Sequence, residues 1–274
     1  MKLATTFALL GGVLSLGLSA GEWELVWGDE FDYQGQPDPA KWGYEVGFVR
    51  NQELQYYTDN RRENARVEDG CLVLEARRET FPNPKYQEGE TNWQRARANA
   101  EYTAASLVTL DKASWQYGRI EVRAKLPQGK GVWPAIWMLG TNRGQIGWPR
   151  CGEIDIMEFV GKQPDYVHGT VHYMGPDGKR RMSGGKLKTA APYEDFHVYA
   201  IEWTAERIDF FYDDNKYFGV ALDAAGQGED NAFRKPFYLL LNFAVGGSWG
   251  GEPDPGAFPS KYLIDYVRVY RRKE

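Results

Sequence analysis

Three carboxylates stand close together in GEIDIMEFVG, residues 152–161. Glu153 and Asp155 are two residues apart, and Glu158 follows three residues later. On a β-strand, alternate side chains point to opposite faces, so Glu153 and Asp155 share a face that a regular strand would deny to Glu158. A β-bulge at Ile156–Met157 would add one residue and return Glu158 to that face. We therefore expect the three carboxylates to lie in one row.

Carboxylates in one row repel each other, so the row needs a chemical task or a bound cation. Two carboxylates about 5 Å apart suit a retaining glycosidase, in which one attacks the anomeric carbon and the other acts as acid and then base. In this scheme Glu153 is the nucleophile, Glu158 is the acid/base, and Asp155 orients Glu153 and raises the pKa of Glu158 by repulsion. A calcium site is the alternative, although the segment lacks the Asp/Asn-and-Gly loop of an EF-hand.

The elements that would position these residues are strands. Short segments alternate apolar and polar residues, and turn-rich pieces such as PDGKRRMSGG separate them. No window shows a long helical stripe, and we find no linker or internal repeat. The pattern predicts one all-β sandwich domain of two antiparallel sheets over residues 21–274. The clearest alternating segments are GRIEVRAKLP, CLVLEA and DYVRVY.

Composition narrows the partners and the compartment. The 274 residues carry a formal net charge of −5, which argues against a nucleic-acid partner. Residues 1–20 have a Lys, an apolar run and small residues at the end, the pattern of a secretory signal peptide. We expect a secreted protein, extracellular or periplasmic, with no membrane attachment after the signal is removed.

Cys71 and Cys151 could pair in such a compartment, but their spacing defines no disulfide framework, and we expect two buried free thiols.

The motifs together resemble a known family. GEIDIMEFVG matches the E-x-D-x-x-E signature of glycoside hydrolase family 16, and GVWPAIWMLG, RNQELQYYT, HGTVHY and LLNFAVGGSWGG are similar to its bacterial laminarinases. The resemblance implies a curved β-jelly-roll sandwich with an open concave cleft and retaining endo-hydrolysis of β-1,3-glucan. The alternatives are the same chemistry on mixed-linkage glucan, agar or carrageenan, and a glucan-binding protein without activity. Because such binding relatives typically lose the catalytic Glu residues, hydrolysis is preferred.

The resemblance also implies cleft residues. Trp133 and Trp137 are four residues apart on an expected strand, so they share a face and could stack on sugar rings, although Trp is also a common core residue. His168 and His172 could suggest a zinc pair, but no third ligand is evident, and His172 is preferred as a cleft residue. The remaining expected sugar contacts are Asn51, Glu53, Asn242 and Trp249.

A structural calcium ion is implied by resemblance alone. The matching positions are Glu30, Gly70 and Asp265, whose oxygens would tie distant segments of the chain together. Local capping or pairing is the alternative role of Asp265. Catalysis needs no cofactor in this scheme, and we expect a monomer that binds a β-glucan polysaccharide.

Overall fold

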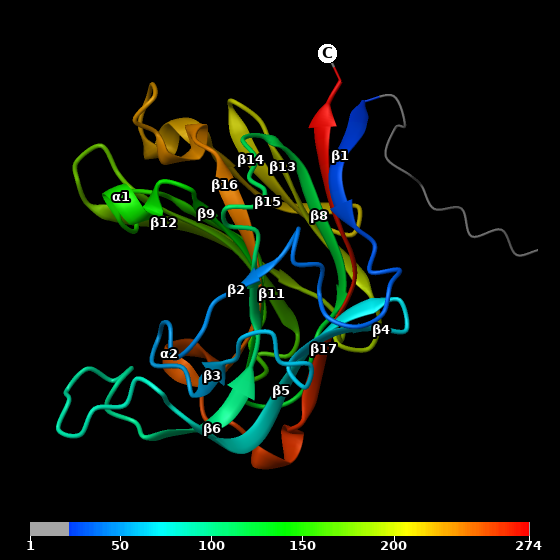
Figure 1. Ribbon diagram of the computed structural model, residues 1–274. Helices are drawn as coiled ribbons and strands as arrows, with labels where there is room; N and C mark the ends of the chain where they lie inside the picture. Colours follow the sequence, from blue (N-terminus) through cyan, green and yellow to red (C-terminus); the bar gives the residue numbers. More distant parts are fainter. Residues whose placement is uncertain (1–21, 274) are drawn as a thin grey trace, which may run out of the picture.

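Two β-sheets lie face to face in the computed structural model, which describes residues 22–273 (Figure 1). The ten-stranded sheet has the order β15-β14-β13-β8-β17-β5-β6-β3, with β1 beside β17 and β4 beside β5. Its strands are β1 (Trp23–Asp29), β3 (Gln55–Tyr57), β4 (Ala65–Glu68), β5 (Cys71–Pro82), β6 (Asn99–Ala104), β8 (Gly118–Lys125), β13 (His197–Trp203), β14 (Arg207–Tyr212), β15 (Asn215–Ala221) and β17 (Ser260–Arg272).

The seven-stranded sheet carries the acidic segment. Its order is β12-β11-β10-β9-β16-β7-β2, so the acidic strand β10 lies in the interior of the sheet between β9 and β11. All its pairings are antiparallel, and the predicted two-sheet, all-β fold is confirmed. Its strands are β2 (Gly43–Tyr44), β7 (Ser106–Val108), β9 (Val132–Gly140), β10 (Glu153–Glu158), β11 (Tyr166–Met174), β12 (Arg180–Lys188) and β16 (Phe237–Val245).

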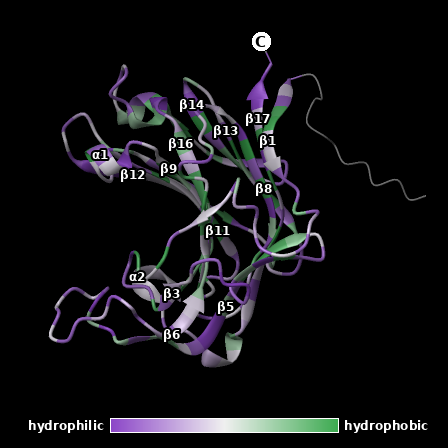
Figure 2. Cartoon of the chain, viewed as in Figure 1, coloured by the Kyte–Doolittle hydropathy of each residue, from purple (hydrophilic) through white to green (hydrophobic). Residues whose placement is uncertain are grey.

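The core fills the space between the sheets, and β8 shows how alternation builds it. Ile120 and Val122 are fully buried, as their period of two predicts. Two residues of the charged face of the same strand, Arg119 and Glu121, are buried as well: they form an ion pair at 3.0 Å, and Arg119 stacks on Phe211. Hydrophobic residues accordingly follow the strands, whereas the outer loops are largely hydrophilic (Figure 2).

In the part of the chain that the structure describes, helices are confined to single turns. They are α1 (Arg143–Ile146), α2 (Gly247–Gly250) and the 3₁₀ turns η1 (Leu222–Ala225), η2 (Ala232–Arg234) and η3 (Pro255–Ala257). Over residues 22–273, no helix has the length and apolar character needed to span a membrane. The segment expected to be a signal peptide, residues 1–20, lies outside the described residues.

The cysteines are free, as expected from their spacing. Cys151 is fully buried just before β10, as expected, whereas the expectation that Cys71 is buried was wrong: it is half-buried at the start of β5. Burial raises the pKa of both thiols, so neither is primed to react as a thiolate.

Candidate active site

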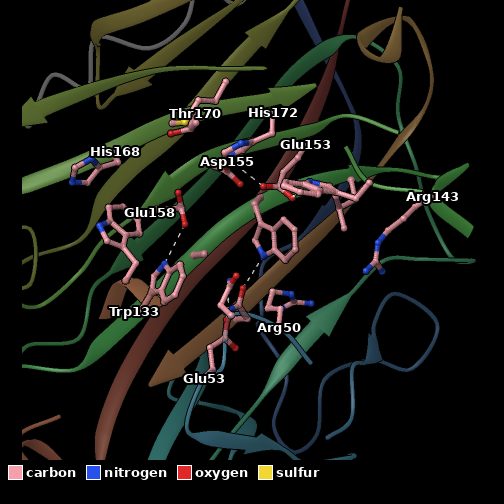
Figure 3. Close-up of a pocket in the computed structure, with 18 of the residues that line it drawn as sticks. Arg50, Glu53, Trp133, Arg143, Glu153, Asp155, Glu158, His168, Thr170 and His172 are labelled. Atoms are coloured by element: carbon pink, nitrogen blue, oxygen red, sulfur yellow. Dashed lines mark hydrogen bonds and ion pairs between the residues drawn. The ribbon is translucent and has the colours of Figure 1, made fainter. Parts of the chain in front are cut away.

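The predicted bulge is present in β10. Against β9 the register shifts between Asp155 and Met157, and against β11 it shifts between Asp155 and Glu158. Ile156 and Met157 therefore both pack in the core. Glu153, Asp155 and Glu158 line one cleft of about 700 Å³ on the other face of the sheet (Figure 3).

The chain enters β10 through a turn that requires glycine. Gly152 has φ of 77°, and a Cβ atom there would lie 2.7 Å from Cζ of Phe237. The residue thus combines a left-handed conformation with a close approach to a buried ring. This turn makes Glu153 the first residue of the strand.

The environment of Glu158 favours its protonated form. Burial raises the pKa of Glu158 well above its ordinary value, and the charges of Asp155 and Glu153 raise it further. The indole N–H of Trp133 donates to Glu158 Oε1 at 3.1 Å, which partly opposes this rise. Burial is the largest cause, and the like-charge repulsion expected from the sequence adds to it.

Glu153 has neighbours that favour the carboxylate. Burial raises its pKa above the ordinary value, and four groups partly oppose this rise: His172, the N–H of Trp148, and the guanidinium groups of Arg50 and Arg180. The two carboxyl groups thus differ in their charged neighbours: cationic groups and an N–H donor partly offset the effect of burial at Glu153, whereas neighbouring carboxylates add to it at Glu158. Such a difference suits one group to act as a nucleophile and the other as a proton donor.

His172 lies on β11 directly opposite Glu153. Its Nε2 atom is 3.6 Å from Glu153 Oε1 and 3.4 Å from Asp155 Oδ2. Asp155 is 4% exposed, its Oδ2 atom lacks a hydrogen-bond partner within residues 22–273, and burial and the charge of Glu153 raise its pKa. The structure therefore places His172 beside both carboxylates, and the orienting of Glu153 by Asp155 stays a prediction.

The two tryptophans of β9 share the cleft face, as their spacing predicts. Trp133 and Trp137 are 7% and 6% exposed and both line the cleft. The indole of Trp137 donates to Asn242 Oδ1 at 2.7 Å, and the ring of Trp133 meets Trp249 edge to face with centroids 5.5 Å apart. The two indole N–H groups thus hold the side chains of Glu158 and Asn242 by hydrogen bonds. Stacking of the indole rings on sugar stays a prediction.

A buried polar network holds the N-terminal wall of the cleft. Glu53 accepts hydrogen bonds from Asn51 at 3.2 Å, Gln55 at 2.7 Å and Tyr57 at 3.3 Å. Asn242 donates in turn to the hydroxyl of Tyr57 at 2.9 Å, which joins this segment to β16. Gln55 and Tyr57 were not predicted, although the alternation that pairs Asn51 with Glu53 in RNQELQYYT continues through both.

Other cleft residues were not predicted for this role from the sequence, although Arg50 and His168 lie within the quoted motifs. Trp148 donates to Glu153 Oε2 at 2.9 Å, and Arg50 stacks on Trp137. His168, considered only as a metal ligand, meets Trp249 with ring centroids 4.9 Å apart. The further lining residues include Arg143, Thr170, Arg180 and Met182.

The acidic row also has the geometry of a metal site. One ligand atom each from Glu153, Asp155 and His172 lie within 4.8 Å of one another, a spacing that could hold an ion. His168 is not part of this group. No step of the chemistry considered below requires a metal here.

The positions expected to bind calcium have other partners. Glu30 accepts from Arg268 at 2.8 Å and 2.9 Å, and Asp265 accepts from Arg123 at 2.6 Å. Gly70 lies in the turn between β4 and β5 with φ of 76°. Carboxylate and carbonyl oxygens suit Ca²⁺, but both carboxylates already pair with guanidinium groups, so the calcium prediction rests on the resemblance alone.

Calcium binding at these positions has a direct test. We expect excess Ca²⁺ to raise the melting temperature by several degrees over EDTA-treated protein, because a ligand that binds only the native state stabilises it. Asp265→Asn should abolish the difference. Equal melting curves with Ca²⁺ and EDTA would reject the site.

Similar proteins point to the same chemistry. The model of "Glycosyl hydrolases family 16" matches residues 52–268. The laminarinase from Rhodothermus marinus is 51% identical, with 92% of this chain and 98% of that chain covered and a TM-score of 0.80. LamA from Z. galactanivorans, solved with laminaritriose and laminaritetraose, is 37% identical, with 90% and 98% covered and a TM-score of 0.78.

A third similar structure comes from work on endo-acting O-glycanases that human gut bacteria express to initiate mucin breakdown. It is 42% identical, with 94% of this chain and 93% of that chain covered and a TM-score of 0.87. The β-sandwich and the row of carboxylates define a carbohydrate-cleaving class of protein. The chain belongs to glycosyl hydrolases family 16.

Proposed function

We propose that this family 16 hydrolase is a secreted, retaining endo-β-1,3-glucanase that cuts laminarin-type glucan. The observation that carries the proposal is the bulged strand β10, which places Glu153 and Glu158 in one cleft, where burial raises the pKa of both and that of Glu158 is raised further by neighbouring charges. Similarity to a laminarinase supports laminarin-type glucan as the substrate. The apolar leader in residues 1–20 supports export, and so does a polymeric substrate.

The reaction proceeds in two displacements. The Glu153 carboxylate attacks the anomeric carbon while Glu158 gives its proton to the departing glycosidic oxygen, which leaves a covalent glycosyl ester. Glu158, now a carboxylate, takes a proton from water, whose oxygen attacks the same carbon and releases Glu153. Two inversions restore the β configuration. Trp133 holds the carboxyl group of Glu158 through its indole N–H.

The proposal is tested by incubating the purified protein with laminarin, curdlan, lichenan and agarose. Early products from laminarin should be oligosaccharides of several sizes, and NMR should show the β-anomer first. Glucose as the sole early product would contradict endo action, and an initial α-anomer would contradict double displacement.

A second polymer deserves a parallel assay because one similar structure comes from work on mucin-cleaving O-glycanases. The same carboxylates would perform the same chemistry on a different sugar backbone. Cleavage of mucin O-glycans with laminarin left intact would favour this second candidate.

Asp155→Asn should move the basic limb of the pH–activity profile to lower pH. Burial raises the pKa of Glu158 most, and the charge of Asp155 is the next cause. Without that charge the pKa of Glu158 falls, so the acid loses its proton at lower pH. The measurement is kcat/KM on laminarin as a function of pH. An unchanged basic limb would show that the charge of Asp155 does not raise the pKa of Glu158.

A further inference from the structure

Trp148 and Arg180 form a stacked pair beside Glu153, and neither belongs to the strand that carries the carboxylates. Trp148 lies between α1 and β10, whereas Arg180 is the first residue of the edge strand β12. The guanidinium carbon of Arg180 lies 4.4 Å from the centroid of the Trp148 ring. The indole N–H donates to Glu153 Oε2 at 2.9 Å. One aromatic ring therefore links the edge of the sheet to Glu153.

The indole of Trp148 needs a partner to stay in this orientation. Its side chain is 40% exposed on a connecting segment, and its ring meets His172 at a centroid distance of 6.0 Å. A half-exposed side chain keeps several rotamers unless contacts select one. A cation over an exposed indole favours one orientation by about two- to fivefold.

Arg180 is available for this contact because no carboxylate pairs with it. Within residues 22–273 it forms no ion pair, whereas its neighbour Arg181 pairs with Asp177 at 2.6 Å. Arg180 lines the cleft and Arg181 does not. The two adjacent arginines thus differ in role, and Arg181 supplies a matched control.

We propose that Arg180 is a positioning residue for the nucleophile. By stacking on Trp148 it holds the indole N–H on Oε2 of Glu153, which leaves Oε1 as the oxygen that attacks the anomeric carbon. This inference rests on the proposed function, in which Glu153 is the nucleophile. Arg180 acts chiefly through the indole: its charge also lowers the pKa of Glu153, but within residues 22–273 no hydrogen bond or ion pair joins it to that carboxylate.

A double-mutant cycle tests this indirect action. Trp148→Phe keeps an aromatic ring but removes the N–H donor, so Arg180 should have nothing to position in that variant. We expect Arg180→Met to lower kcat on laminarin about two- to fivefold with KM nearly unchanged. In the Trp148→Phe background the same change should cause a clearly smaller loss, because only the direct effect of the Arg180 charge on Glu153 is left to remove. Arg180→Lys should recover part of the rate, and Arg181→Met should match the unmodified enzyme.

Two results would overturn the proposal. One is an equal loss from Arg180→Met in both backgrounds, and the other is a change confined to KM, which would make Arg180 a substrate contact. Melting temperatures identify any variant that is misfolded, and Arg180→Lys then replaces Arg180→Met in the cycle. An unmodified enzyme that leaves laminarin intact would instead refute the proposed function.

Discussion

Glu153→Gln is expected to lower kcat on laminarin by at least about 10³-fold. An amide cannot form the glycosyl ester, although its oxygen can still accept the hydrogen bond that Trp148 donates. Folding should survive, because burial already disfavours the charge of Glu153 and the amide is neutral. The measurements are reducing-sugar release, the melting temperature and binding of laminarin oligosaccharides.

The matched control for this variant is Glu206→Gln, which makes the same chemical change at an exposed position that does not line the cleft. Its turnover should equal that of the unmodified enzyme. Azide should restore turnover of an activated β-glycosyl substrate by Glu153→Ala, with an α-glycosyl azide as product, because azide attacks where the carboxylate stood. Normal laminarin turnover by Glu153→Gln would exclude Glu153 as the nucleophile.

Glu158→Gln should lower kcat/KM on laminarin by about 10² to 10⁴-fold, the usual contribution of a general acid. The loss in the first step should nearly vanish on an aryl glycoside whose leaving group is a weakly basic nitrophenol, because such a group departs without a proton. The glycosyl-enzyme should then accumulate, since no base activates water. Comparing the two substrates by pre-steady-state kinetics measures both effects.

Azide separates the roles of the two glutamates. In Glu158→Ala it should intercept the glycosyl-enzyme and yield a β-glycosyl azide, the opposite anomer to that from Glu153→Ala. Equal losses on laminarin and on the aryl glycoside would show that Glu158 does not act as the acid.

The fold and the centre of the site could be predicted because both depend on local spacing. Alternation fixes which face of a strand is apolar, and the three-residue step from Asp155 to Glu158 already requires a bulge. The structure places the bulge at the expected residues. The shared face of Trp133 and Trp137 follows from the same rule.

The rest of the site depends on contacts between distant segments, which spacing does not encode. Trp148 lies in an irregular segment, and its partner Arg180 is on an edge strand. The network from Glu53 to Asn242 likewise spans the two ends of the sequence. Trp148, in GWP five residues before Glu153, is close enough in the sequence to have suggested a cleft residue. Its residue type alone, however, does not distinguish a cleft tryptophan from one that packs in the core.

The extra residue in β10 inverts the inside–outside sense of all that follows it in the strand. Its loss would leave every acid in place along the chain but exchange the orientations of Glu158 and Phe159, driving a charge into the core and a benzyl group into the cleft. Stability and turnover would fail together. A deletion in this strand that misplaces Glu158 would therefore also destabilise the fold, because it would disrupt the hydrophobic core.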